Sequence, residues 1–240
     1  MRAESGAKRL HCAVCLRPQS SCICQWITPL AHQVEVLILQ HPLEVDQAKG
    51  SARLLHLSLP HSRLVTGETF AEAQLRALLD EPFDAQAAAG GADSVGHKQA
   101  LLLYPHSPQD QALGLSAPPA LAPALLREPA RLRLVVLDGT WRKSRKMLYS
   151  NPLLQQLPRL SLQGMGASQY RIRKAHKPDQ LSTLEATCAA LMQLEGRAAP
   201  FEPLLAAFDG FVAQQLGYRP AAMRPDSGPQ AGDGVHSAQS

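Results

Sequence analysis

Four of the five cysteines in this 240-residue chain lie in one short opening stretch, with the order Cys12-x2-Cys15-x6-Cys22-x-Cys24. Four thiolates that converge from a short loop form a closed tetrahedral zinc site, which stabilises a segment with little core of its own. The first pair has the spacing of a zinc knuckle, and the second pair is one residue tighter. We therefore expect a structural zinc ion on these four cysteines. His11 in place of one ligand, or four loosely grouped free thiols, are the alternatives.

A second chemical candidate is the stretch "VVLDGTW" (135–141), in which an acid follows an apolar run. If the run is a parallel strand, Asp138 lies at its carboxyl end, where open α/β sheets bind ligands. Gly139 permits a tight turn or the close approach of a ligand. Thr140 can cap the helix that follows, and Trp141 can cover a flat ring. The structural alternative makes Asp138 a loop cap and Trp141 a core residue.

Two clusters of cations adjoin predicted helix starts. One follows the tryptophan directly, and the other lies in "YRIRKAHK" (170–177), which contains no acid. Two such segments beside an acid would form a positive groove, for which a phosphate backbone is a suitable partner. Taken singly, each cluster is more often a solvated surface. The candidate RNA-binding residues are Arg142, Lys143, Arg145, Lys146, Lys174 and Lys177.

Three continuous apolar runs, residues 34–40, 101–105 and 132–138, predict buried strands. The long segments between them suit parallel strands joined by crossover helices, so the fold class is α/β. A turn and then a helix are expected after Pro42. Residues 181–196 predict a helix that opens with a Ser-x-x-Glu capping box, and its apolar stripe makes Cys188 a core residue.

Composition limits the class of protein further. A net charge of +4 is too small for the protein as a whole to attract nucleic acid. Any preference for nucleic acid must therefore come from local clusters of cations. There is no apolar run of membrane-spanning length and no signal-peptide pattern, so we expect a cytoplasmic protein with reduced thiols. We expect a zinc-binding segment over 1–30, a catalytic domain over 31–218 and a disordered tail over 219–240. Residues 85–96 and 117–123 are expected to be surface loops.

Six motifs in order make the chain resemble the DTW-domain family, the tRNA-uridine aminocarboxypropyltransferases. They are the four-cysteine opening, "HPLE" (41–44), "LLLYP" (101–105), "DGTW" (138–141), "YRIRK" (170–174) and "LSTLEA" (181–186). The resemblance covers residues 11–216, with one departure at Gly50-Ser51, where an Asn-Thr-Gly-like turn is expected. The family is related to the SPOUT class, so the resemblance implies a SPOUT-like knotted parallel sheet with an N-terminal zinc-binding cap.

The activity that this resemblance implies is transfer of the 3-amino-3-carboxypropyl group of S-adenosylmethionine to N3 of a uridine in tRNA, which leaves methylthioadenosine. N3 must lose its proton to become a nucleophile, and a carboxylate within hydrogen-bond reach can take it. Asp138 is the candidate base, or else it orients the amino group of the cofactor. Helix amides after Gly139, or Arg171 and Arg173, can hold the carboxylate of the cofactor.

The motifs assign residues to roles by their position. The candidate catalytic residues are Asp138, Thr140 and Trp141. The candidate cofactor-binding residues are Tyr104, Pro105, Leu137, Gly139, Tyr170, Arg171, Arg173, Leu181, Ser182, Thr183 and Glu185. Three other functions stay open at this point: a SPOUT-like RNA methyltransferase, a ribosomal-RNA aminocarboxypropyltransferase, and a zinc-stapled RNA-binding module without catalysis.

Overall fold

The structure is a computed structural model, and it describes residues 10–83, 98–105, 117–162 and 181–217. Its centre is a five-stranded sheet in the order β2-β1-β4-β3-β5, in which every strand pair is parallel. The strands are β1 (Glu35–Gln40), β2 (Ser62–Thr66), β3 (Gln99–Leu103), β4 (Leu132–Asp138) and β5 (Arg159–Leu160). Because the strands are parallel, their carboxyl ends share one edge of the sheet, called the C-terminal edge below.

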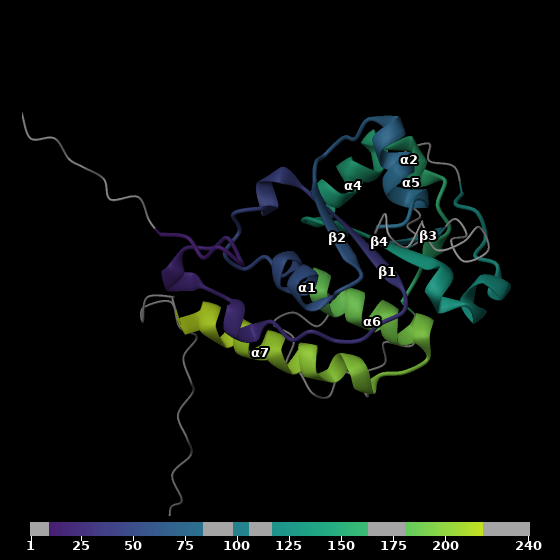
Figure 1. Cartoon of the computed structure of the whole chain (residues 1–240). Helices are drawn as coiled ribbons and strands as arrows, with labels where there is room; N and C mark the ends of the chain where they lie inside the picture. The colour runs from purple at the N-terminus through teal and green to yellow at the C-terminus, as the bar shows by residue number, and fades with distance from the viewer. Residues whose placement is uncertain (1–9, 84–97, 106–116, 163–180, 218–240) are drawn as a thin grey trace, which may run out of the picture.

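Helices cover both faces of the sheet (Figure 1). One face packs against α1 (Ala52–Ser58) and α6 (Thr183–Glu195), and α7 (Glu202–Gly217) joins the same core on the outer side of these two helices. The other packs against α2 (Glu72–Asp80), α4 (Trp141–Ser150) and α5 (Pro152–Gln155). Successive residues of the central strand β4 alternate between the two cores, and all seven are buried. Burial on both faces explains why this strand is apolar apart from Arg133 and Asp138.

The sequence predicted the three central strands closely. The expected runs 34–40, 101–105 and 132–138 correspond to β1, β3 and β4, so the α/β class with a parallel sheet is confirmed. The helix at 181–196 is also confirmed, and it begins with the predicted capping box. Cys188 is fully buried in the core, as expected. Residues 117–122 form no regular element and are largely exposed, which agrees with the expected surface loop.

The turn and the helix expected after Pro42 are both present, but the helix begins well after the proline. Pro42–Glu44 form only a short 3-10 turn, and the helix α1 begins ten residues later, at Ala52. The intervening residues 45–49 are polar or exposed, so they offer no apolar face that a helix could bury. The segment 41–51 is therefore a loop along the C-terminal edge, and we call it the rim loop.

Several expectations concern residues outside the described ranges. The expected knot stays a prediction, because the described residues do not include the segment 163–180 between β5 and α6. The insert at 85–96 and the tail from 219 likewise lie outside the described residues. Among the residues that the structure describes, no helix is both long enough and apolar enough to cross a membrane.

Candidate functional site

Asp138 ends the central strand, and its carboxylate is held between two neutral donors. The amide nitrogen of Gln40 donates to Oδ2 over 2.9 Å, and the hydroxyl of Thr183 donates to Oδ1 over 2.6 Å. Gln40 is the last residue of β1 and is paired in register with Asp138, whereas Thr183 is the first residue of α6. The carboxylate thus links the two central strands to a helix start at the C-terminal edge.

Burial sets the protonation behaviour of this acid. Asp138 is only 5% exposed, and desolvation raises the pKa of its carboxyl above the ordinary value. The hydrogen bonds from Thr183 and Gln40 lower the pKa and so offset part of that rise, while the nearby charge of Glu44 adds to it. A carboxylate with a raised pKa accepts a proton more readily than an ordinary one, which suits a general base.

The turn from β4 into α4 is tightly packed. A Cβ atom at Gly139 would lie 3.1 Å from Cβ of Lys143 and 3.6 Å from Cβ of His41, so a larger residue would displace its neighbours. Thr140 occupies the N-cap position of α4, but its side chain forms no capping hydrogen bond. The expected capping role of the Thr140 hydroxyl is therefore wrong. Thr140 is exposed beside the C-terminal edge.

Trp141 is an exposed aromatic residue at the start of α4, with 53% of its surface accessible. The alternative that places it in the core is therefore wrong. Its ring meets the buried ring of Tyr104 edge to face, with centroids 5.9 Å apart. Tyr104 and Pro105 directly follow β3, so the aromatic pair stands at the C-terminal edge, next to Leu137 and Asp138 on β4.

Arg159 is a residue near this pair that the sequence did not indicate. It begins β5, is almost fully buried, and holds its guanidinium 5.3 Å from the centroid of the Tyr104 ring. A single arginine in "LPRLSL" has no motif around it, and only the strand order brings it to the aromatic pair. Its position adds a buried positive charge to this part of the C-terminal edge.

The cations of α4 are partly neutralised by acids from other segments. The ammonium group of Lys143 lies 2.7 Å from a carboxylate oxygen of Glu44, and that of Lys146 lies 2.9 Å from Glu68. Glu68 also accepts from the imidazole of His41 over 2.8 Å. The sequence could not show these pairs, since both acids are distant along the chain. The side chain of Lys146 remains 64% exposed despite its ion pair.

The other α4 cations differ in their surroundings. Arg142 is exposed at the start of the helix, whereas Arg145 is half-buried. The predicted second cluster and its neighbours, Tyr170, Arg171, Arg173, Lys174 and Lys177, lie outside the described residues. Whether the two basic clusters form one groove therefore stays a prediction.

The N-terminus of α6 brings several predicted cofactor-binding residues to the C-terminal edge. The Ser182 hydroxyl accepts from the backbone N–H of Glu185 over 3.2 Å, and the Glu185 carboxylate accepts from the N–H of Ser182 over 2.9 Å. These two side chains therefore stabilise the helix start. Thr183 points to Asp138 instead, and the next N–H, of Leu184, donates to Ser51 of the rim loop over 3.2 Å. Leu181, just before the cap, is half-buried.

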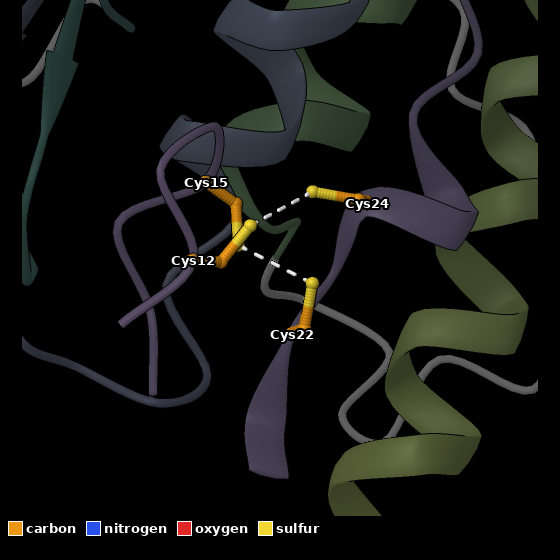
Figure 2. A group of neighbouring side chains, drawn as sticks. All are labelled: Cys12, Cys15, Cys22 and Cys24. Atoms are coloured by element: carbon orange, nitrogen blue, oxygen red, sulfur yellow. Dashed lines mark hydrogen bonds between the residues drawn. The ribbon is translucent and has the colours of Figure 1, made fainter. Parts of the chain in front are cut away.

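The four N-terminal cysteines converge on one point (Figure 2). Their sulfur atoms all lie within 4.8 Å of one another, and the Cys12–Cys24 and Cys15–Cys22 pairs are 3.5 and 3.7 Å apart. Tetrahedral zinc with Zn–S bonds of about 2.3 Å separates its sulfur ligands by about 3.8 Å, so the cluster fits that ion. His11 is exposed and is not part of this cluster. The cysteines are thus positioned to bind a metal ion.

The turn around the first two cysteines favours a negative charge. Hydrogen bonds from the backbone of Cys15 and Val14 lower the pKa of Cys12 to about 6. Burial, followed by hydrogen bonds within the cluster, raises the pKa of Cys24 to about 12. The opposite directions mean that Cys12 gives up its proton before Cys24 does. The thiolate that these backbone N–H groups favour is also the form of cysteine that binds a metal.

Comparison with known proteins gives the chain a family. The sequence model of the DTW domain matches residues 9–216. A Drosophila melanogaster protein named tRNA-uridine aminocarboxypropyltransferase 2 is 31% identical over 205 residues, which cover 81% of this chain and 70% of that protein. A Mus musculus protein of the same name is 29% identical over 218 residues, covering 89% of this chain and 66% of the mouse protein.

A more distant relative is the Arabidopsis thaliana protein named tRNA-uridine aminocarboxypropyltransferase A. It is 25% identical over 152 residues, which cover 61% of this chain and 53% of the plant protein. No solved structure matches the chain. The domain match covers most of the sequence and includes the four cysteines, Asp138 and the start of α6. This chain belongs to the DTW domain family.

Proposed function

We propose that this protein transfers the 3-amino-3-carboxypropyl group of S-adenosylmethionine to N3 of a uridine in tRNA. Membership of the DTW domain family and the names of the fly and mouse relatives support transfer of this group to tRNA. The observation that carries the proposal is the buried carboxylate of Asp138, held by Gln40 and Thr183 at the C-terminal edge of a parallel sheet. That edge is where such sheets bind their ligands.

In this proposal the bound sulfonium supplies an activated methylene carbon, so that a new N–C bond forms at uridine N3 while the C–S bond breaks and methylthioadenosine leaves. Asp138 takes the N3 proton as the bond forms and later passes it to solvent. Gln40 and Thr183 fix the orientation of the carboxylate, since each bonds a different oxygen. The second possible role of Asp138 is to bind the amino group of the methionine arm.

The remaining site residues have supporting roles in the proposal. Trp141 and Tyr104 offer ring faces and edges for the uracil or the adenine, since stacking tolerates any base. Pro105, Leu137, Gly139 and Thr140 line the approach to Asp138. Leu181, Ser182, Thr183 and Glu185 build the helix start that faces the cofactor, and Tyr170, Arg171 and Arg173 complete its binding site.

Two further parts of the proposal concern ligands. Zinc bound by Cys12, Cys15, Cys22 and Cys24 is structural, since all four ligand positions are then filled. The tRNA backbone binds Arg142, Lys143, Arg145 and Lys146 of α4, together with Lys174 and Lys177. We also propose that the sheet has the trefoil knot of the SPOUT class.

Nucleoside analysis tests this function. The purified protein is incubated with bulk tRNA and S-adenosylmethionine, and the digested nucleosides are identified by mass spectrometry. The proposal predicts uridine carrying one aminocarboxypropyl group, together with methylthioadenosine. Methylated nucleosides with S-adenosylhomocysteine would mean a methyltransferase. Product on ribosomal RNA alone would mean that ribosomal RNA, not tRNA, is the substrate. RNA binding without any turnover of the cofactor would mean a non-catalytic binding module.

A further inference from the structure

Arg17 joins the cysteine cluster to the rim loop. It lies two residues after Cys15, and its guanidinium donates to the backbone carbonyl oxygen of Gly50 over 2.8 Å and to that of Ala48. The same guanidinium lies 5.3 Å from the centroid of the Phe211 ring on α7. One side chain from the N-terminal cap thus contacts both a helix on the sheet face and the loop along the C-terminal edge.

The conformation of the cysteine turn directs Arg17 to this position. The N–H of Cys12 donates to the carbonyl of Arg17 over 2.8 Å, and the N–H of Leu16 donates to the carbonyl of Cys12 over 2.9 Å. Leu16 has a φ of 60°, a left-handed conformation that is uncommon for a residue other than glycine. A metal ion bound by Cys12 and Cys15 would close this turn and so offset the strain at Leu16.

The N-terminal cap is also packed against helix α7. The ring of Trp26 packs so closely on Gly210 of α7 that a Cβ atom there would overlap it. The indole N–H of Trp26 donates to Gln214, and the amide of Gln214 donates back to the carbonyl of Cys22. These contacts fix the cap to α7, near the lower left of the molecule in Figure 1. Arg17 therefore projects from a segment that is fixed to α7.

The rim loop carries this connection on to the candidate site. Glu44 of the loop pairs with Lys143 of α4, and the hydroxyl of Ser51 accepts from the backbone N–H of Leu184 at the start of α6. Leu184 directly follows Thr183, whose hydroxyl holds Asp138. The loop therefore contacts both helix starts that flank the carboxylate, and its position affects how they present their groups.

We propose that Arg17 is a positioning residue that couples the metal-binding cap to the cofactor site. By fixing the carbonyl groups of residues 48 and 50, it holds the rim loop against α4 and α6 in the arrangement that binds S-adenosylmethionine. The part that concerns the cofactor rests on the proposed function. The coupling itself, from cap to helix α6, rests only on the contacts above.

The test compares Arg17→Gln with the matched control Arg53→Gln. Arg53 donates to the Val14 carbonyl of the same cysteine turn, but it bonds no carbonyl of the rim loop. Each variant is measured for zinc content, for amide hydrogen exchange by mass spectrometry, and for S-adenosylmethionine affinity by calorimetry. All three measurements use the zinc-loaded full chain.

Arg17→Gln is expected to keep one zinc per chain. Its exchange should accelerate by about tenfold or more in residues 41–51 and 181–186, and its cofactor affinity should fall by about tenfold, since charge-assisted hydrogen bonds to the loop are lost. Arg53→Gln should leave amide exchange unchanged in both of these segments. Unchanged exchange in both peptides of Arg17→Gln, with faster exchange in the cap alone, would overturn the coupling.

One further variant and the cofactor binding of the wild-type protein complete the test. Arg17→Lys retains the positive charge but loses the two-pronged donor geometry, so it should show a smaller change in the same two peptides, and it replaces Arg17→Gln if that variant does not fold. If the wild-type protein bound no S-adenosylmethionine, the proposed function would fail, while the exchange data would still decide the coupling. Faster exchange with unaltered cofactor affinity would overturn the link to the cofactor site.

Discussion

The hydroxyl of Thr183 donates a 2.6 Å hydrogen bond to the carboxylate of Asp138, although the two residues are 45 positions apart in the chain. Thr183 is the first residue of α6, and Asp138 is the last residue of β4. The bond therefore attaches a helix start on one face of the sheet to the tip of the central strand. It also orients the one acid that ends this strand, which connects fold stability to the chemistry proposed for the site.

Replacement of Thr183 tests this bond. Thr183→Val keeps the shape of the side chain but removes the donor, and Thr183→Ser keeps the donor. A lost hydrogen bond to a buried charged group costs about 1 to 3 kcal/mol, so Thr183→Val should lower the free energy of unfolding by about that amount. Thr183→Ser should stay closer to the wild type. Urea denaturation measures both, and equal stability of all three proteins would mean that the bond contributes little.

The pH dependence of stability tests the burial of Asp138. Because burial raises its pKa in the folded state, the folded protein holds this proton where the unfolded chain has lost it. This group therefore lowers stability as pH rises from the ordinary aspartate pKa through the raised one. Asp138→Asn lacks this titration, so its stability relative to the wild type should rise as pH increases through the same range. Urea denaturation of both proteins at several pH values checks the trend, and a stability difference that does not change with pH would contradict it.

Metal analysis tests the cysteine cluster. We predict one tightly bound zinc per chain in protein purified without added metal. Cys22→Ser should lose most of the zinc and destabilise the cap, since one of four ligands is gone. Cys188→Ala should keep the full zinc content, because Cys188 is buried in the helical core away from the cluster. A folded wild-type chain without metal would show that the geometry serves another purpose.

Salt-dependent binding tests the role of α4 in tRNA recognition. Arg142→Gln should weaken tRNA binding and reduce the slope of log K against log salt by about one unit, because one phosphate contact is lost. The control is Arg76→Gln on α2, where the native arginine is exposed and paired with Glu72. An unchanged slope for Arg142→Gln, or equal effects of both variants, would place the tRNA elsewhere.

Much of the fold could be predicted from the sequence because its central strands are buried on both faces. A largely apolar run such as 132–138 is typical of a strand buried in this way, and the capping box at Ser182 marks a helix start by residue chemistry alone. The helix expected after Pro42 begins only at Ala52, because a proline that can start a helix also fits a short turn, and the exposed residues 45–49 carry no apolar face. Local pattern therefore indicated the elements but not every boundary.

Less of the site could be predicted from the sequence, because its contacts join segments that are distant along the chain. The pairing of Lys143 with Glu44, the position of Arg159 beside Tyr104, and the bond from Thr183 to Asp138 all depend on strand order and helix placement. Motif position indicated Asp138, but it gave no partner for either carboxylate oxygen. Those partners follow only once β1 and α6 are placed around β4.

The central claim is that Asp138 acts in aminocarboxypropyl transfer to tRNA uridine, and single-turnover rates of Asp138→Asn test it most directly. The substitution keeps the size of the side chain and one of its two accepting oxygens but removes the basic carboxylate, so the folded variant should lose about 10² to 10⁴ in rate. Raising the pH should partly restore the rate if Asp138 is the base, because more uridine then ionises unaided. Weakened S-adenosylmethionine affinity without pH rescue would instead identify it as the anchor of the cofactor's amino group. Wild-type yield and rate of aminocarboxypropyl-uridine from Asp138→Asn would contradict the account.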